Sequence, residues 1–338
     1  MKKNLVLAVV LLAAGGWYFL DMDISSLLDT ESEVSSFVSD SGDIEVYFCP
    51  HQDCTTPLVD FLGSAQESIH CAMFEIDLDP VRDKLLEKSE EIEVLVVTDN
   101  DYLYEFDHPF VKTDTWGLMH NKFCIVDSKK ISSGSMNPTN NGANKNNNNL
   151  IFIDSDVLAT NYEAEFQEMY SGTFKKGEKV LNPSVSLGEI EIQNYFCPED
   201  DCAERIKNEL EKATSSIKFM TFSFTHEGIA NILLLKHNDG ISVEGVMEAR
   251  QVTKYSQFER LTYQGVDAVK DGNKQNMHHK TFLIDTLSPD CTIITGSMNP
   301  TGGGNKRNDE NVLIIKDDVE LCQAFDEEYE KIREEAES

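Results

Sequence analysis

Positive charge is scarce in this chain. Its 338 residues contain 29 lysines and arginines against 60 aspartates and glutamates, a formal net charge of -31 at pH 7. So much negative charge keeps a protein soluble and opposes the long-range attraction of polyanions. The composition therefore argues against an avid nucleic-acid binder. Adaptation to a salty environment is another interpretation of the same excess, and the sequence leaves it open.

The length allows more than one domain. At 338 residues, 40% of them hydrophobic, the chain is long enough for two globular domains of ordinary size, or for one pseudo-symmetric pair.

One stretch of the sequence occurs twice, each time preceded by Met. In both copies a His and a Lys stand two residues apart, an Asp follows five residues after the Lys, and the run Gly-Ser-Met-Asn-Pro-Thr comes next. The residues are His120, Lys122, Asp127 and Gly134 to Thr139 in the first copy, and His278, Lys280, Asp285 and Gly296 to Thr301 in the second. A single short match is unremarkable, but the recurrence of the whole arrangement is a strong signal.

The spacing of the repeat is expected to bring its polar side chains together. Short apolar runs follow Lys122 and Lys280 and indicate buried strands, on which residues two apart share a face. Each His therefore projects beside its Lys, and a second strand that ends in Gly-Ser presents Asn137 or Asn299. Two such copies supply a nucleophile, a general acid and donors for the phosphoryl oxygens of a phosphodiester.

This pair of motifs resembles the phospholipase D superfamily, the phosphodiesterases with two His-Lys-Asp motifs, over about residues 44–335. The resemblance implies an α/β fold with two pseudo-symmetric halves, each a mixed sheet flanked by helices, and an active site at their interface. It also implies a reaction through a phosphohistidine, with no metal or other cofactor. Because one chain carries both half-sites, an oligomer is not required.

The resemblance also assigns roles to residues. His120 is the expected nucleophile, and His278 is the expected acid and then the base for the attacking water. The phosphate is expected to be held by Lys122, Lys280, Asn137 and Asn299. The expected supporting residues are Asp127, Asp285, Ser135, Ser297 and Glu310.

The two copies differ at one position that bears on the histidines. Glu310 stands eleven residues after Asn299, whereas Asn148 stands eleven residues after Asn137. In the family this position often carries an acid that hydrogen-bonds an active-site histidine. An ionised partner holds one tautomer and stabilises an imidazolium, so we expect the two histidines to differ in pKa. That Asn148 is simply a polar loop residue is the alternative.

The N-terminus has an apolar segment behind a basic flank. Lys2 and Lys3 precede an almost wholly apolar run that ends at Leu20, near the lower limit of length for spanning a bilayer. We interpret residues 1–20 as an uncleaved membrane anchor that holds the rest outside the cytoplasm. A cleaved signal peptide, which would leave a secreted protein, stays open. Residues 21–43 are predicted to be an acidic linker.

The elements of the repeat define the domain boundaries. Predicted strands and helices alternate in both halves, which favours an α/β fold with a largely buried sheet. The first half is expected at residues 44–176 and the second at 189–335, with a linker at 177–188.

Eight cysteines are present. In an exported domain, Cys49 with Cys54 and Cys197 with Cys202 are expected to form local disulfides. A four-cysteine zinc site and free thiols are the alternatives. The other cysteines lie in apolar runs and are predicted to be small core residues. These are Cys71, Cys124, Cys291 and Cys322.

The predicted function is a metal-independent phosphodiester hydrolase of phospholipase D type. A membrane tether and an acidic surface slightly favour a phospholipid substrate. The compact halves also suit an endonuclease of the same superfamily, and a phosphatidyl transferase or a catalytically silent phosphate-binding module are further alternatives.

Overall fold

The computed structural model describes residues 7–13, 16–22 and 38–338. They belong to two compact units, Met1–Ser36 and Phe37–Ser338, which are considered separately. In the first unit, β1 (Leu7–Ala13) pairs antiparallel with β2 (Gly16–Met22).

A membrane anchor of the kind predicted at residues 1–20 would span the bilayer as a helix, and the described residues of this segment do not form one. In the described ranges, no helix is both long enough and apolar enough to cross a bilayer. A short apolar run cannot be assigned to helix or strand by periodicity alone. Aromatic and β-branched residues such as Val9, Val10 and Tyr18 favour a strand. Most of the predicted linker, residues 23–37, lies outside the described residues.

The second unit contains two sheets of the same design. The first has the order β4-β11-β10-β9-β5-β6-β7. Its strands are β4 (Ile44–Cys49), β5 (Ser68–Met73), β6 (Glu93–Thr98), β7 (Val111–Thr113), β9 (Lys122–Val126), β10 (Lys130–Gly134) and β11 (Asn148–Asp154).

The other sheet repeats this order strand for strand, as β13-β19-β18-β17-β14-β15-β16. Its strands are β13 (Ile190–Cys197), β14 (Ser216–Thr221), β15 (Ser242–Met247), β16 (Asp267–Lys270), β17 (Lys280–Ile284), β18 (Thr292–Gly296) and β19 (Asn308–Lys316). The prediction of two pseudo-symmetric mixed α/β halves is confirmed. Beyond β13 the sheet continues with β12 (Ser184–Leu187) and β3 (Val38–Asp40), which lie inside the predicted linkers.

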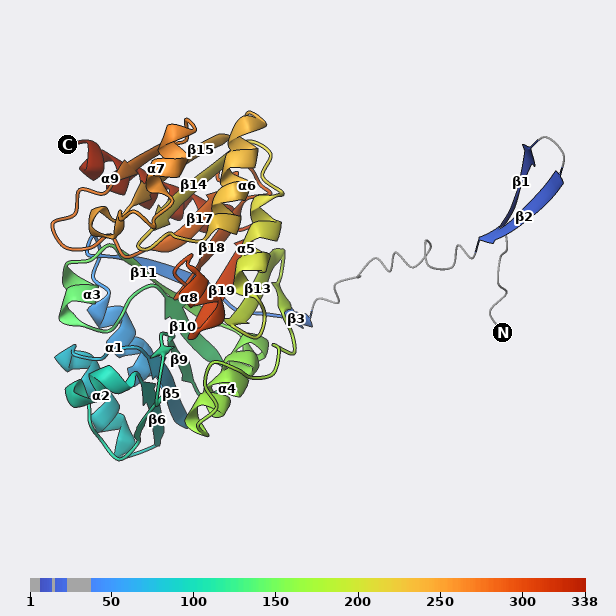
Figure 1. Ribbon diagram of the computed structural model, residues 1–338. Helices are drawn as coiled ribbons and strands as arrows, with labels where there is room; N and C mark the ends of the chain where they lie inside the picture. The colour runs from blue at the N-terminus through green and yellow to red at the C-terminus, as the bar shows by residue number, and fades with distance from the viewer. Residues whose placement is uncertain (1–6, 14–15, 23–37) are drawn as a thin grey trace. The chain divides into compact units, whose positions relative to one another are not determined.

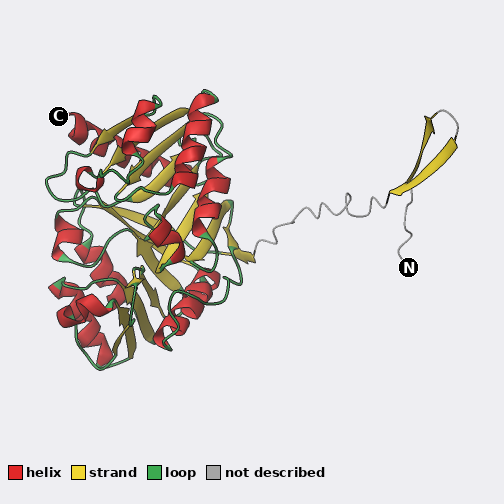
Figure 2. Ribbon diagram, in the orientation of Figure 1, coloured by secondary structure: helices red, strands yellow, loops and turns green. Residues whose placement is uncertain are grey.

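Helices flank both sheets (Figures 1 and 2). The first half carries α1 (Thr55–Gly63), α2 (Asp79–Ser89), η2 (Asn100–Glu105), α3 (Asn140–Asn144) and α4 (Asp156–Tyr170). The second half carries α5 (Cys202–Leu210), α6 (Glu227–Asn238), η3 (Ala249–Gln251), α7 (Phe258–Tyr263), α8 (Gly302–Lys306) and α9 (Val319–Glu337).

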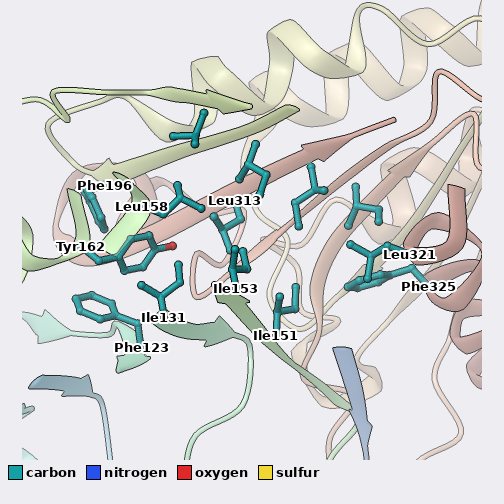
Figure 3. Packing of buried hydrophobic residues seen from close by; sticks show 14 of the residues in the cluster. Phe123, Ile131, Ile151, Ile153, Leu158, Tyr162, Phe196, Leu313, Leu321 and Phe325 are labelled. Carbon is teal, nitrogen blue, oxygen red and sulfur yellow. The ribbon is translucent and has the colours of Figure 1, made fainter. Parts of the chain in front are cut away.

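A shared hydrophobic core joins the two halves. One cluster combines α4 and α9 with the facing sides of both sheets, whereas α1 and α2, and α5 and α6, pack in separate outer clusters. Figure 3 shows Phe123 and Tyr162 of the first half beside Phe196 of the second, and the Tyr162 and Phe196 ring centroids are 5.0 Å apart. Because close-packed interiors resist deformation, this core holds the halves in one relative position.

The segment before each motif histidine also crosses between the halves. β8 (Leu118–Met119) pairs parallel with the start of β19, and Met277 forms an isolated bridge with Asn147. The His120 and His278 amides donate to the carbonyls of Asp309 and Asn147, at 2.9 and 2.8 Å. Each histidine is thereby placed next to the last strand of the other half.

All the cysteines form disulfides. The predicted pairs Cys49–Cys54 and Cys197–Cys202 are present, which excludes their alternative interpretation as zinc ligands or free thiols. The other four are buried in the core, as predicted, but the prediction did not include the two further bonds that they form, Cys71–Cys124 and Cys291–Cys322. Cys71 and Cys124 are direct partners on β5 and β9. Neither pair is close in sequence, so spacing carried no signal.

Candidate active site

His120 is held by residues of the opposite half. Its Nδ1 lies 2.6 Å from Oε2 of Glu310, a residue with no exposed surface. Ser297 Oγ donates to the same carboxylate oxygen at 2.8 Å, and Asn308 Nδ2 donates to the other at 3.0 Å. Burial raises the pKa of Glu310 to about 7, while burial, Lys122 and Lys280 lower the pKa of His120. His120 is therefore neutral near pH 7, and the ionised form of Glu310 accepts its Nδ1–H, so that the lone pair lies on Nε2, for which no side-chain partner is found among the described residues.

His278 is held in the mirrored way by an amide. Its Nδ1 lies 2.9 Å from Oδ1 of Asn148 in the first half. Asn148 Nδ2 donates to the Gly142 carbonyl at 3.0 Å, and Ser135 Oγ donates to Oδ1, also at 3.0 Å. These contacts fix the amide orientation, so Nδ1 of His278 must donate, and within the described residues Nε2 has no side-chain partner. Asn148 is thus a partner of His278 and not a plain loop residue.

The two motif lysines share this environment. Lys122 Nζ donates to the His120 carbonyl at 2.7 Å, and Lys280 Nζ donates to the His278 carbonyl at 2.5 Å. Burial lowers the pKa of Lys122 to about 8, and burial together with the charge of Lys122 lowers the pKa of Lys280 well below its usual range. The charges of both lysines also lower the pKa of both histidines. The four side chains therefore lie together where the halves meet.

Asn137 and Asn299 follow tight turns at the ends of β10 and β18. Gly134 and Gly296 adopt φ values of +126° and +139°, and a Cβ there would lie 2.4 and 2.3 Å from the carbonyls of Asn149 and Asn311. Only glycine fits such a backbone without strain. Asn137 is 7% exposed, and the Oδ1 atoms of both asparagines have no hydrogen-bond partner in the described part of the chain.

The motif aspartates lie away from the histidines, at the far ends of β9 and β17. Asp127 accepts the backbone N–H groups of residues 66–68, at 2.7 to 3.0 Å. Asp285 accepts those of residues 214–216 and also the hydroxyls of Thr214 and Ser215. These hydrogen bonds lower the pKa of Asp127 and bring that of Asp285 to about 2, although burial opposes them. Both residues anchor the start of the neighbouring strand.

Sequence reasoning missed three residues of the site. The rings of Phe74 and Phe222 lie edge-on to His120 and His278, with centroids 4.8 and 4.7 Å apart, and Lys122 and Lys280 lie over them. Glu75 accepts a hydrogen bond from Asn137 Nδ2 at 2.8 Å. The internal repeat could have indicated the two phenylalanines, since a Phe directly follows the second strand of each half. Glu75 has no such signal, because Ser223 stands at its equivalent position.

His279 lies between His278 and Lys280 in sequence, and its side chain contacts residues outside the site. Its Nδ1 accepts from Asn149 Nδ2 at 3.0 Å, and its Nε2 lies 3.9 Å from Glu328 of α9. Over residues 7–13, 16–22 and 38–338, no group of three or more His, Cys, Asp or Glu side chains could hold a metal ion.

The site contains two imidazoles and two ammonium groups at the interface of two like halves. This arrangement defines a class of enzyme, the phosphodiesterases with paired His-Lys half-sites. A family model described as "Cardiolipin synthase, PLD-like domain" matches residues 58–170 and 206–333, more than half of the chain. The chain therefore belongs to the phospholipase D superfamily, and it is a phosphodiesterase.

Individual relatives agree with this assignment. A phospholipase D of Rickettsia conorii is 29% identical over 160 residues, which are 43% of this chain and 78% of the relative. A mitochondrial cardiolipin hydrolase of Mus musculus is 32% identical over 132 residues, which are 39% of this chain and 58% of that relative. The phosphatidylserine synthase of Haemophilus influenzae has the same fold over 86% of both chains, with a TM-score of 0.63 and 14% identity.

Proposed function

We propose that this protein hydrolyses phosphodiesters through a phosphohistidine, without a metal, and that His120 is the nucleophile. The observation that carries the proposal is the unequal support of the two histidines. His120 has a buried carboxylate partner, whereas His278 has an amide partner.

The unequal partners match two different tasks. When His120 Nε2 bonds to phosphorus, its ring becomes cationic, and the Glu310 carboxylate at Nδ1 stabilises that charge. His278 must instead give a proton to the departing oxygen. A neutral amide at its Nδ1 stabilises the imidazolium less than a carboxylate does, so protonated His278 is the stronger acid.

The reaction starts with His278 protonated at Nε2 and then has two balanced steps. The Nε2 lone pair of His120 attacks phosphorus, the bond from phosphorus to the leaving oxygen breaks, and His278 protonates that oxygen. In the second step His278 takes a proton from water, the water oxygen attacks phosphorus, and the bond to His120 breaks. Lys122, Lys280, Asn137 and Asn299 hold the phosphoryl oxygens, and Ser135 and Ser297 orient the partners of the histidines.

A phospholipid is the substrate we propose. Relatives named phospholipase D and cardiolipin hydrolase support it, and the net charge of -31 opposes a polyanion. An endonuclease of the same superfamily is the second candidate, favoured by the compact halves. An alcohol in place of water would make the enzyme a phosphatidyl transferase. A silent phosphate-binding module is disfavoured because every motif His and Lys is present.

We also propose that the catalytic unit works outside the cytoplasm, either anchored to a membrane through the N-terminal segment or secreted. The disulfides support this location, because such bonds persist in oxidising compartments.

The test is hydrolysis of bis-p-nitrophenyl phosphate in the presence of EDTA by the wild type and by His120→Ala. We expect turnover that EDTA leaves unchanged and that the substitution abolishes. Activity lost to EDTA while the fold persists would contradict the metal-free mechanism. Head-group release from phosphatidylcholine vesicles, compared with cleavage of single-stranded DNA at equal enzyme concentration, decides between the two substrates.

A further inference from the structure

Glu75 is a charged residue of the first half-site that has no counterpart in the second. It follows Phe74 at the end of β5, and its Oε1 accepts a hydrogen bond from Asn137 Nδ2 at 2.8 Å. Among the described residues, Asn137 is 93% buried and its Oδ1 has no partner. A buried amide with one engaged nitrogen and one unengaged oxygen is unusual, since buried polar atoms are normally hydrogen-bonded.

The pseudo-symmetry of the fold provides an internal comparison. Ser223 occupies the equivalent place after β14, but its Oγ donates to Gln251 Oε1 at 3.0 Å and does not reach an asparagine. Within residues 38–338, Asn299 has no side-chain acceptor for its amide nitrogen. The contact between Glu75 and Asn137 is therefore an addition to one half-site and not a feature of the duplicated fold.

The chemistry of the contact fixes the amide. An ionised carboxylate can only accept, so it selects the rotamer of Asn137 that directs Nδ2 toward Glu75 and opposes a flip that would bring Oδ1 there. One N–H of Nδ2 is used by Glu75, and the second stays available. Extending the function proposed above, we propose that Glu75 is a positioning residue that orients the Asn137 amide so that its second N–H donates to the phosphoryl group.

The charge of Glu75 supports the same half-site. Burial raises the pKa of Glu75, whereas the Asn137 hydrogen bond and the charge of Lys122 lower it. In return, the charges of Glu310, Glu75 and Asp99 oppose the effect of burial on the pKa of Lys122. Removal of the carboxylate should thus leave Lys122 easier to deprotonate, in addition to freeing the amide.

The test compares Glu75→Ala and Glu75→Gln in the full-length protein, each in the wild-type and the Asn137→Ala background, with bis-p-nitrophenyl phosphate. Glu75→Gln keeps an acceptor oxygen and removes the charge, and Ser223→Ala is the matched control in the second half. Loss of one preorganised donor to a transition state costs about 10²–10³-fold in kcat, and misorientation should cost less. We expect Glu75→Ala to lower kcat roughly 10- to 100-fold with little change in KM, and Glu75→Gln to recover most of it.

Two readouts separate positioning from a general loss of structure. At a pH below the alkaline limb, where Lys122 stays protonated, Glu75→Ala in the Asn137→Ala background should cause no further loss of kcat, because the amide that Glu75 would orient is gone. The alkaline limb of kcat/KM should move to lower pH in Glu75→Gln, since Lys122 loses a stabilising charge. An equal loss in both backgrounds, or a Glu75→Gln variant as impaired as Glu75→Ala, would overturn the proposal, as would an equal effect of Ser223→Ala.

The experiment also distinguishes a failure of the proposed function. If the wild-type protein hydrolyses no phosphodiester, the function is wrong, and the side-chain amide signals of Asn137 in NMR spectra decide on Glu75. The contact is supported if the two Nδ2 protons of Asn137 have unequal chemical shifts in the wild type and shifts typical of a solvent-exposed amide in Glu75→Ala. A spectrum that does not change refutes it.

Discussion

Replacement of Glu310 by Gln is the most informative single change in this protein. It retains the shape of the side chain and removes its charge, so that His120 would face an amide as His278 already does. The variant therefore tests whether one histidine can still act as nucleophile and the other as acid when both have neutral hydrogen-bond partners.

The contacts of Glu310 set the size of the effect. His120 Nδ1 and Ser297 Oγ both donate to Oε2, at 2.6 and 2.8 Å, while Asn308 Nδ2 donates to Oε1 at 3.0 Å. Gln offers one acceptor oxygen and one NH₂ group, so either His120 and Ser297 or Asn308 must face a donor. A hydrogen bond to a charged group is worth about 1.5–3 kcal/mol, and a donor left unpaired in the interior adds about 1–3 kcal/mol.

We expect Glu310→Gln to raise the barrier of phosphohistidine formation by about 3–4 kcal/mol, which lowers kcat roughly 10²–10³-fold. The assay is the single-turnover rate of p-nitrophenolate release, together with the yield of acid-labile phosphoenzyme. Asn148→Asp is the matched change in the other half. It gives His278 an anionic partner, so it should raise the pKa of His278 and slow proton delivery to the leaving group.

Retention of the single-turnover rate within twofold in a folded Glu310→Gln protein would refute this reasoning. If the phosphoenzyme still forms on His120 and only its hydrolysis slows, Glu310 acts in the second step and not in the first.

Three further predictions concern stability. Asp285 has a pKa of about 2 in the folded protein, below its ordinary value of 3.8, so its contribution of about 2 kcal/mol is present above pH 4 and is lost as the pH falls toward 2. Asp285→Asn should therefore lower the unfolding free energy at pH 7 more than Asp127→Asn does, because Asp127 lacks the two hydroxyl donors of Asp285. Urea unfolding measures both variants, and equal losses would contradict this prediction. Burial and the neighbouring carboxylates Asp309, Glu168 and Asp200 raise the pKa of Glu199 to about 7 from 4.5, so the folded state loses stability as the pH rises from about 4.5 through 7. Glu199→Gln should stabilise the protein by about 1–2 kcal/mol at pH 8 and have little effect at pH 4.5, and equal gains at both values would show that ionisation is not the cause. The Cys71–Cys124 bond, with a sequence separation of 53, should contribute about 4 kcal/mol by chain entropy, against about 2 kcal/mol for Cys49–Cys54, so paired alanine substitutions should lower Tm more at the longer loop.

The duplicated motif made much of the site predictable. Strand alternation placed His120 beside Lys122, and the Gly-Ser turn placed Asn137 after the second strand. The motif aspartates were expected to support rather than react, and they lie at the far ends of β9 and β17. That placement follows from a five-residue strand that begins at the Lys and ends directly before the Asp.

Other features could not be read from sequence for identifiable reasons. The Cys71–Cys124 bond depends on the register of β5 against β9, which no local spacing encodes. Glu75 meets Asn137 only because two separate loops approach one another. At the N-terminus, a run of apolar residues suits both a helix and a strand, and the helix that we predicted is not found there.

By itself, the sequence determined which residues make up the candidate site and the fact that they come in pairs, because an internal repeat records both directly. Only the tertiary structure decided which group supports which. Glu310 serves the histidine of the other half, since the backbone before each histidine pairs with the last strand of the opposite sheet. That exchange arises from the packing of two halves around one core, and a linear pattern of residues cannot specify it in advance.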